Sequence, residues 1–290
     1  MRVVFTHFNR FNFMEDSNPL PRFLLFAGAI SWKRFYPEDR VILYTDSETL
    51  RYFPGISDQF KKWDEIIEIS NWDKIEKELE INEKFWAWPR VYTALLEKEP
   101  CCIVDIDVVL FSAFKTEFSL EKPWATRYTS VDPVYTKIMD IPGSDTYIGT
   151  SRNYYNGGLI YHPTVEGLHE ISHRVLEADK TSFGKTAINL YGFSDYAIVV
   201  EQSIPCKYYE EDCKLTPELF DQLDLLDHCA TTPGIVYHAM GTKYTKDFQE
   251  RCKIIQTVGY KALGFTQEQL RLFLRDLRIG GIYCNNKNLV

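Results

Sequence analysis

The chain has 290 residues, 45% of them hydrophobic, and a formal net charge of -8. A chain of this length and composition can bury a substantial core, and nothing in it suggests disorder. The acidic balance argues against a nucleic-acid binder, because clustered Lys and Arg supply most of the affinity for a phosphate backbone. Seven cysteines, an odd number at irregular positions, favour a reducing compartment over a disulfide framework.

The amino terminus leads directly into a strand-like run, Met1 to Phe5, without the basic and apolar segments of a signal peptide. No window approaches the roughly 20 apolar residues that a membrane-spanning helix needs. We therefore expect a soluble, cytoplasmic protein without a transmembrane segment.

The first seventy residues alternate between strand and helix patterns. Arg2 to Thr6 predicts a strand, 23–35 a helix with apolar residues at helical spacing, and 40–46 a second buried strand. A third strand is expected at 65–69. The order strand, helix, strand is typical of the beginning of a doubly wound α/β fold.

Residues 82–98 are apolar on more than one face and predict a helix that leads into the next strand. Lys84 and Arg90 are the notable charges of this helix. They could face a ligand, or they could lie on the surface with their aliphatic stems against apolar neighbours.

The next segment, 101–111, is an apolar run interrupted by Asp105 and Asp107. Burying a carboxylate in such a strand costs several kcal/mol unless a positive group meets it. If the strand continues, both aspartates face one side; if it ends at Asp105, they lie on the loop at its carboxyl end, where open α/β sheets bind ligands. Either geometry suits a hard divalent cation that also holds phosphates. The alternative is that both are solvated turn residues or helix caps.

Four later segments are relevant to a ligand site. The irregular stretch 112–150 is expected to cover a substrate. Asn156-Gly157-Gly158 predicts either a hairpin turn or a close approach of the backbone to a ligand. A helical pattern that begins near Ser194 ends in Glu201-Gln202, a short strand is expected at 207–209, and a later strand ends at His238 before Gly241 and Lys243.

The order Asp105-Ile106-Asp107, Asn156-Gly157-Gly158, Glu201-Gln202 and His238-x-x-Gly241-x-Lys243 resembles the nucleotide-sugar glycosyltransferases of the GT-A fold, in particular the glycogenin-like, retaining family 8. The stretch 85–111 also resembles a group of uncharacterised bacterial and viral glycosyltransferase-like proteins. The resemblance covers about residues 1–245 and rests on motif order.

The resemblance implies an α/β fold, with a GT-A type Rossmann-like mixed sheet flanked by helices in a single domain. It implies a nucleotide-binding half at 1–111, a sugar and acceptor half at 112–250 and a C-terminal helical segment at 251–290.

The resemblance also implies a role for each motif. Asp105, Asp107 and His238 would hold Mn²⁺ or Mg²⁺, which grips the diphosphate of a UDP-sugar. Glu201 and Gln202 would be the catalytic pair near the anomeric carbon, with Glu201 standing where the family has Asp. The donor-binding residues implied by the resemblance are Thr6, His7, Lys84, Arg90, Asp105, Ile106, Asn156, Gly157, Gly158, Gly241 and Lys243.

These assignments predict a metal-dependent hexosyltransferase that uses UDP-glucose or UDP-galactose, acts on a saccharide or protein-linked glycan acceptor, and retains the anomeric configuration. An inverting enzyme would need a carboxylate base, for which Asp132, Asp145 and Asp195 are candidates. The alternative is a non-catalytic nucleotide-sugar binder or a degenerate transferase scaffold. A nucleotidyltransferase is disfavoured because no Gly-rich loop follows the first strand. A phosphatase is disfavoured because this strand ends in Thr6, where its nucleophilic Asp would be expected.

Overall fold

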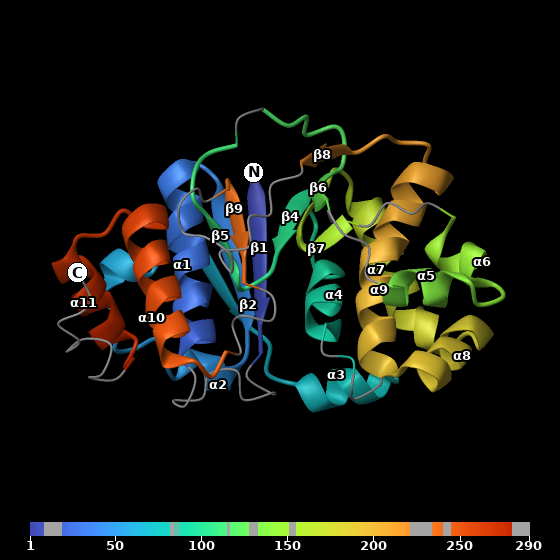
Figure 1. Ribbon diagram of the computed structural model, residues 1–290, viewed down its shortest axis with the longest axis horizontal. Coiled ribbons are helices and arrows are strands. Elements are labelled where there is room, and N and C mark those ends of the chain that lie inside the picture. The colour runs from blue at the N-terminus through green and yellow to red at the C-terminus, as the bar shows by residue number, and fades with distance from the viewer. Residues whose placement is uncertain are drawn as a thin grey trace. The chain divides into compact units, whose positions relative to one another are not determined.

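The computed structural model describes residues 1–8, 19–81, 85, 87–114, 117–127, 133–150, 155–220, 234–239 and 245–279. By its internal contacts the chain divides into two units (Figure 1). Unit 1 comprises Met1–Ile69, Asp105–Thr116 and Gln222–Val290, and unit 2 comprises Ser70–Val104 and Glu117–Asp221. The boundaries at residues 111 and 250 that the resemblance implies stay a prediction.

Unit 1 contains three parallel strands in the order β3, β2, β1, and a separate antiparallel pair of β5 with β9. Its strands are β1 (Arg2–His7), β2 (Arg40–Thr45), β3 (Glu65–Glu68), β5 (Val108–Leu110) and β9 (Val236–His238). Its helices are α1 (Leu20–Phe35), α2 (Ser47–Leu50), η2 (Asp58–Phe60), α10 (Phe248–Thr257), η6 (Val258–Ala262) and α11 (Gln267–Asp276).

Helix α1 supports the strands of unit 1. Every residue from Leu20 to Trp32 is buried, which explains why the helix is apolar on all sides. Pro21 lies in the first turn, where the N–H that proline lacks would have no partner within the helix. Helix α1 packs against β2, β5 and α10 (Figure 1).

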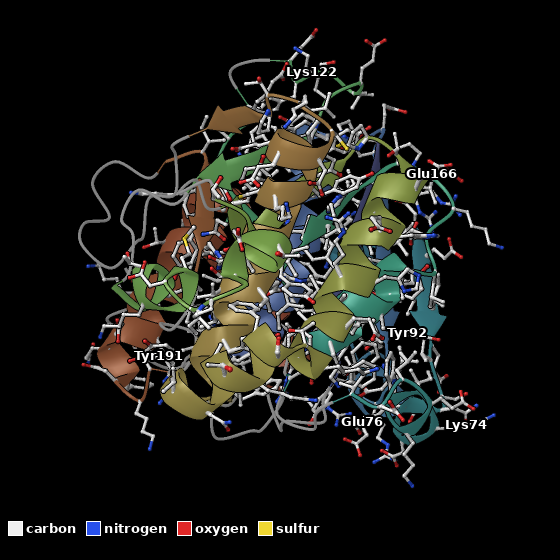
Figure 2. All side chains as sticks on the ribbon, turned by 90° about the vertical axis from the view of Figure 1, so that its right-hand side faces the viewer. Lys74, Glu76, Tyr92, Lys122, Glu166 and Tyr191 are labelled. Carbon is white, nitrogen blue, oxygen red and sulfur yellow. The ribbon has the colours of Figure 1, made fainter. Side chains whose placement is uncertain are left out.

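Unit 2 contains a mixed sheet in the order β4, β7, β6, β8, in which only the pairing of β6 with β8 is parallel. Its strands are β4 (Cys101–Val104), β6 (Trp124–Arg127), β7 (Tyr155–His162) and β8 (Glu218–Phe220). Its helices are α3 (Trp72–Glu78), α4 (Trp88–Ala94), α5 (Pro133–Met139), α6 (Ser144–Ile148), α7 (Val165–Glu177), η3 (Ala178–Lys180), α8 (Ser182–Tyr191), α9 (Phe193–Cys206) and η4 (Lys207–Asp212). Figure 2 faces the helices of this unit, with Glu166 near the start of α7 and Tyr191 at the end of α8.

The structure corrects several element boundaries. The helix expected at 82–98 is described only as the shorter α4. Helix α3 before it was not predicted, and its apolar residues are only partly buried. The strand expected at 207–209 is wrong: these residues begin the π-helix η4, where Lys207 forms ion pairs with Glu211 and Asp212. Helix α9 is capped by Gly192 and not by Ser194. Among the described residues, no helix combines the length and apolar character that crossing a membrane requires.

Candidate functional site

The Asp-x-Asp segment is a turn between two short strands. Strand β4 ends at Val104, and the backbone N–H of Val108 donates to the carbonyl of Asp105 at 3.1 Å, which closes the turn before β5 begins. A single strand through both aspartates is therefore wrong, and the alternative with the pair on a loop after the strand is confirmed. In a turn, the two carboxylates are not bound to the regular side-chain directions of a strand.

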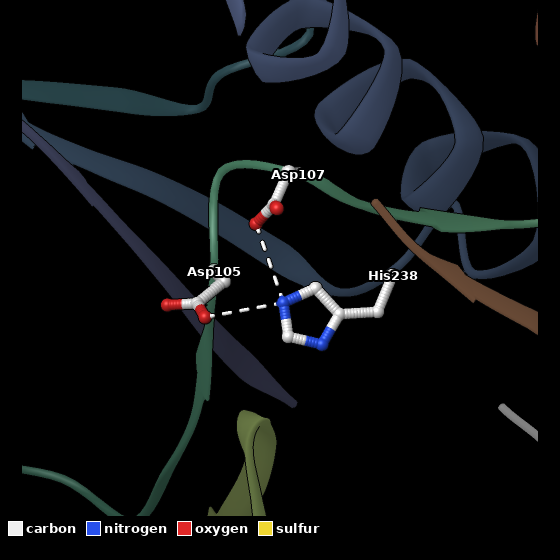
Figure 3. Close-up of side chains that lie close together, drawn as sticks. All are labelled: Asp105, Asp107 and His238. Carbon is white, nitrogen blue, oxygen red and sulfur yellow. Dashed lines mark ion pairs between the residues drawn. The ribbon is translucent and has the colours of Figure 1, made fainter. Parts of the chain in front are cut away.

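Strand pairing in unit 1 brings His238 to this turn. Val108 of β5 pairs with His238 of β9, and the N–H of Ala239 donates to the carbonyl of Asp107 at 3.0 Å. The imidazole Nε2 atom of His238 lies 3.4 Å from Asp105 Oδ2 and 3.4 Å from Asp107 Oδ1. Figure 3 shows the ring nitrogen directed at both carboxylates.

Helix α1 holds β5 in position from behind. The hydroxyl of Ser31 donates to the carbonyl of Gly28 at 2.8 Å and accepts from the N–H of Leu110 at 3.0 Å. A Cβ atom at Gly28 would lie 2.8 Å from the carbonyl oxygen of Val108, so only glycine allows this close approach. The sequence analysis missed both residues, although a glycine inside an apolar helical pattern is a signal of close packing.

The side chains of Asp105, Asp107 and His238 differ in exposure. The Asp107 side chain is fully buried, that of His238 is 8% exposed, and that of Asp105 is 24% exposed. Burial lowers the pKa of His238, but the charge of Asp107, hydrogen bonds to both carboxylates and the charge of Asp105 outweigh it and raise the pKa to about 9. A buried acid, Asp107, and a partly exposed one, Asp105, thus face one imidazole and form a site that favours positive charge.

The donor set fits a divalent cation. One ligand atom from each of Asp105, Asp107 and His238 can be chosen so that all three lie within 4.8 Å of one another. Two ligands that each lie about 2.1 Å from one ion are separated by at most about 4.2 Å. Each of the two carboxylate–imidazole pairs, at 3.4 Å, meets this limit. Carboxylate oxygens with one imidazole suit Mn²⁺, Mg²⁺ or Zn²⁺ by donor type.

A second group of predicted site residues meets inside unit 2. Arg90 of α4 forms an ion pair with Glu201 of α9, and its Nη1 atom donates to the carbonyl of Gly157 in β7 at 2.6 Å. A Cβ atom at Gly157 would lie 3.0 Å from the Arg90 guanidinium, and Gln202 Cγ is 3.8 Å from the same point. Arg90, Gly157 and Glu201 border a cavity of about 50 Å³, room for a few waters at most.

The Asn-Gly-Gly segment lies in strand β7, so the hairpin turn is wrong. The pairing of β6 with β7 shifts register between Arg127–Tyr155 and Ala125–Ile160, so the segment forms an irregularity in the ladder. The buried Asn156 side chain accepts from the N–H of Gly158 at 2.8 Å. The group that lies close to the backbone at Gly157 is the Arg90 guanidinium, and the expected close approach of a ligand stays a prediction.

The remaining predicted residues are dispersed over the fold. Thr6 and His7 are the last two residues of β1, and the carbonyl of the buried His7 accepts from Thr45 at 2.8 Å. Ile106 lies in the turn between the two aspartates. Asp145 and Asp195, considered as bases for inversion, are exposed. Lys84, Asp132, Gly241 and Lys243 lie outside the described residues.

Comparisons with known proteins identify a fold. No family model and no curated protein sequence matches the chain. A galactosyltransferase, LgtC, crystallised with donor and acceptor sugar analogues, is similar with a TM-score of 0.51 and 11% identity over 90% of this chain and 96% of that chain. Mouse xyloside xylosyltransferase 1, in its apo form, has a TM-score of 0.50 and 10% identity over 84% of this chain and 100% of that chain. The chain has the GT-A fold.

This result confirms the predicted fold class, a GT-A type Rossmann-like mixed sheet flanked by helices. At such low identity the likeness establishes the fold, and the chemistry must be argued from the side chains at the site. Among the described residues, Asp105, Asp107 and His238 form a group of three potential metal ligands that comes from two segments far apart in the sequence.

Proposed function

We propose that the chain is a metal-dependent glycosyltransferase that moves a hexose from a UDP-sugar to a saccharide or protein-linked glycan acceptor, with retention of configuration. The observation that carries the proposal is the position of His238 Nε2, 3.4 Å from a carboxylate oxygen of both Asp105 and Asp107. The GT-A fold, shared with a galactosyltransferase and a xylosyltransferase, supports a sugar nucleotide as the donor.

Asp105, Asp107 and His238 would hold the divalent cation, Mn²⁺ in the first instance. When bound, the cation supplies positive charge that stabilises the departing diphosphate. The buried Asp107 would be the inner ligand. The more exposed Asp105 would face the nucleoside as well as the cation.

Glu201 and Gln202 would lie at the anomeric carbon of the donor. The ion pair with Arg90 restrains the Glu201 carboxylate, and a restrained side chain loses less entropy when a substrate binds. Retention would follow from two successive displacements, in which one of these side chains displaces UDP and the acceptor hydroxyl then displaces the side chain, or from front-face attack by the acceptor hydroxyl as UDP departs. The other donor contacts in the proposal are Thr6, His7, Lys84, Arg90, Ile106, Asn156, Gly157, Gly158, Gly241 and Lys243.

The test is the thermal stability of the protein with UDP, with MnCl₂, with both and with neither. The proposal predicts a larger rise in Tm with both than the two single additions give together, because a ligand that binds only the native state stabilises it. Asp107→Ala should abolish this extra rise, whereas Asp145→Ala, an exposed acid on α6, should retain it. If no nucleotide stabilises the protein, the proposal is wrong.

Donor identity follows from metal-dependent release of UDP in the absence of acceptor. UDP-glucose, UDP-galactose and a GDP-sugar are incubated with MnCl₂ or with EDTA, and the free nucleotide is measured. The proposal predicts release of nucleotide from a UDP-hexose only. NMR of the released sugar shows which anomer forms first, and therefore whether the configuration is retained.

A nucleotide-sugar binder without transfer activity is the second candidate, and one observation favours it. The Glu201 carboxylate is 7% exposed and already ion-paired with Arg90, an arrangement that also serves as a structural link between α9 and α4. Nucleotide-dependent stabilisation without release of UDP from any donor would favour this candidate.

A further inference from the structure

A pocket of about 380 Å³ lies among the helices of unit 2. Residues from four segments border it: Tyr147 of α6, Arg174 and Glu177 of α7, Thr181 before α8, and Lys207 and Asp212 of η4. Its volume falls within the range typical of small-molecule sites, about 300–1,000 Å³. Asp105, Asp107 and His238, the potential metal ligands, belong by contrast to unit 1.

The wall of this pocket carries charges of both signs, already paired with each other. Arg174 Nη1 donates to Asp212 Oδ2 at 2.5 Å, and Arg174 Nε donates to Glu170 at 2.8 Å. Lys207 Nζ lies 3.3 Å from Asp212 and 3.4 Å from Glu211. Such pairing fixes the side chains before any ligand arrives and leaves the wall without an excess of positive charge.

Asp212 remains a hydrogen-bond acceptor at neutral pH. Partial burial raises its pKa, but hydrogen bonds from Arg174 and Lys207 lower it below its usual value. Its side chain is 33% exposed, as is that of Arg174, so solvent reaches both side chains.

An aromatic ring stands beside these charges. The Tyr147 ring lies nearly parallel to the Phe183 ring, with an interplanar angle of 10° and centroids 5.9 Å apart. Stacking on Phe183, a buried residue, holds the half-buried tyrosine in place where it borders the pocket. An aromatic side chain of this kind offers apolar contact area at little entropic cost.

We propose that this pocket is a binding subsite for a neutral saccharide of one or two sugar units. The hydroxyls of a sugar can replace the waters on Arg174 and Asp212, and charge-assisted hydrogen bonds of this kind are stronger than neutral ones. The apolar face of the sugar ring then packs against Tyr147. An apolar ligand would desolvate the ion pairs without replacing their hydrogen bonds, and an anion would meet carboxylates as well as cations.

The binding test uses the full chain with EDTA and without nucleotide, so its result is independent of the proposed transfer reaction. Lactose, maltotriose, cellotriose and chitotriose are the probes, with inorganic phosphate as an anionic comparison. Binding is detected by saturation-transfer NMR, and Kd is measured by calorimetry. We expect at least one oligosaccharide to bind and phosphate not to displace it.

Asp212→Asn and Tyr147→Ala test the location of the site. Each should raise the Kd of the bound oligosaccharide by about tenfold or more, as expected for the loss of a charge-assisted hydrogen bond or an aromatic contact. Lys74→Gln is the matched control, because it removes an exposed ion pair with Glu78 on α3 of the same unit. Thermal melting verifies folding, and Tyr147→Leu, which keeps apolar contact with Phe183, replaces the alanine variant if that one unfolds.

Three outcomes would overturn the proposal. These are no binding of any oligosaccharide, binding that both pocket variants leave unchanged, and displacement of the sugar by phosphate. Loss of binding in Asp212→Asn and Tyr147→Ala, with binding retained in Lys74→Gln, would support it even if no donor is hydrolysed.

Discussion

Val108 pairs with His238 across the β5–β9 ladder, and this register position determines where the imidazole lies. Asp107 directly precedes Val108, so the pairing sets His238 beside the turn that carries both carboxylates. The ladder contains only three residue pairs, and the N–H of Ala239 extends it by one bond to Asp107. So short a ladder supplies few hydrogen bonds, and the packing of α1 against β5 adds to its support.

The first prediction concerns the imidazole. His238→Gln should weaken Mn²⁺ binding at least about tenfold, because loss of a ligand should cost no less than loss of an outer-shell partner. Free Mn²⁺ is measured by electron paramagnetic resonance during titration. Asp145→Asn should bind like the unmodified protein, and equal affinity of all three proteins would contradict the assignment of His238.

The second prediction concerns the packing behind the ladder. Gly28→Ala places a Cβ atom 2.8 Å from the carbonyl oxygen of Val108, so α1 or β5 must shift. Overpacking of this kind costs about 1–3 kcal/mol in the free energy of unfolding, measured by urea titration. Gly55→Ala is the control, since its nearest new contact is 3.9 Å away. The Gly28 variant should also bind Mn²⁺ more weakly, and unchanged stability would refute the argument.

The third prediction concerns the ion pair inside unit 2. The side chains of Arg90 and Glu201 are only 11% and 7% exposed, so Arg90→Met leaves a buried carboxylate without this partner. The free energy of unfolding should fall by about 3–5 kcal/mol, and Arg90→Met with Glu201→Met should recover much of the loss. The control is Arg40→Met, which breaks an exposed pair with Glu65 and should cost less than about 1 kcal/mol. A double variant as unstable as the single one would rule out this explanation.

The sequence predicted those parts of the fold that depend on local apolar patterns. Strands β1, β2 and β3 and helix α1 lie where alternation and helical spacing placed them. Helix α3 was missed because its apolar residues, Trp72 and Ile75, are only partly buried against the core of unit 2 and form a short apolar stripe. The sequence did not decide whether the strand in 101–111 continues through both aspartates or ends at Asp105. A run of apolar residues does not reveal where a strand leaves one sheet and enters another.

The sequence identified the residues of the candidate site but not the residues that hold them in position. Order along the chain related His238 to Asp105 and Asp107, and the structure brings the three together. The roles of Ser31 and Gly28 depend on the approach of α1 to β5, which joins residues far apart in sequence and leaves no local pattern. The ion pair of Arg90 with Glu201 was missed for the same reason, although both residues were candidates.

The fourth prediction concerns His162, which is buried in β7 with its Nδ1 atom 2.8 Å from the hydroxyl of Tyr209. Burial, with a smaller contribution from the charge of Arg90, lowers the pKa of His162 from 6.5 to about 3. Below pH 6.5 the unfolded chain therefore takes up a proton that the folded chain does not bind. The stability that the neutral imidazole contributes is complete above pH 6.5 and is lost progressively as the pH falls toward 3.

The measurement is the free energy of unfolding by urea at intervals between pH 7.5 and 4.5. The contribution of His162 should fall by up to about 1.4 kcal/mol per pH unit below 6.5. His162→Gln has no titrating group, so the difference between the unmodified protein and this variant should shift by about 2–3 kcal/mol between pH 6.5 and 4.5. His173→Gln, which replaces an exposed side chain on α7, is the matched control. Parallel profiles for the unmodified protein and His162→Gln would show that His162 takes up its proton equally in the folded and unfolded chain, which would contradict the prediction.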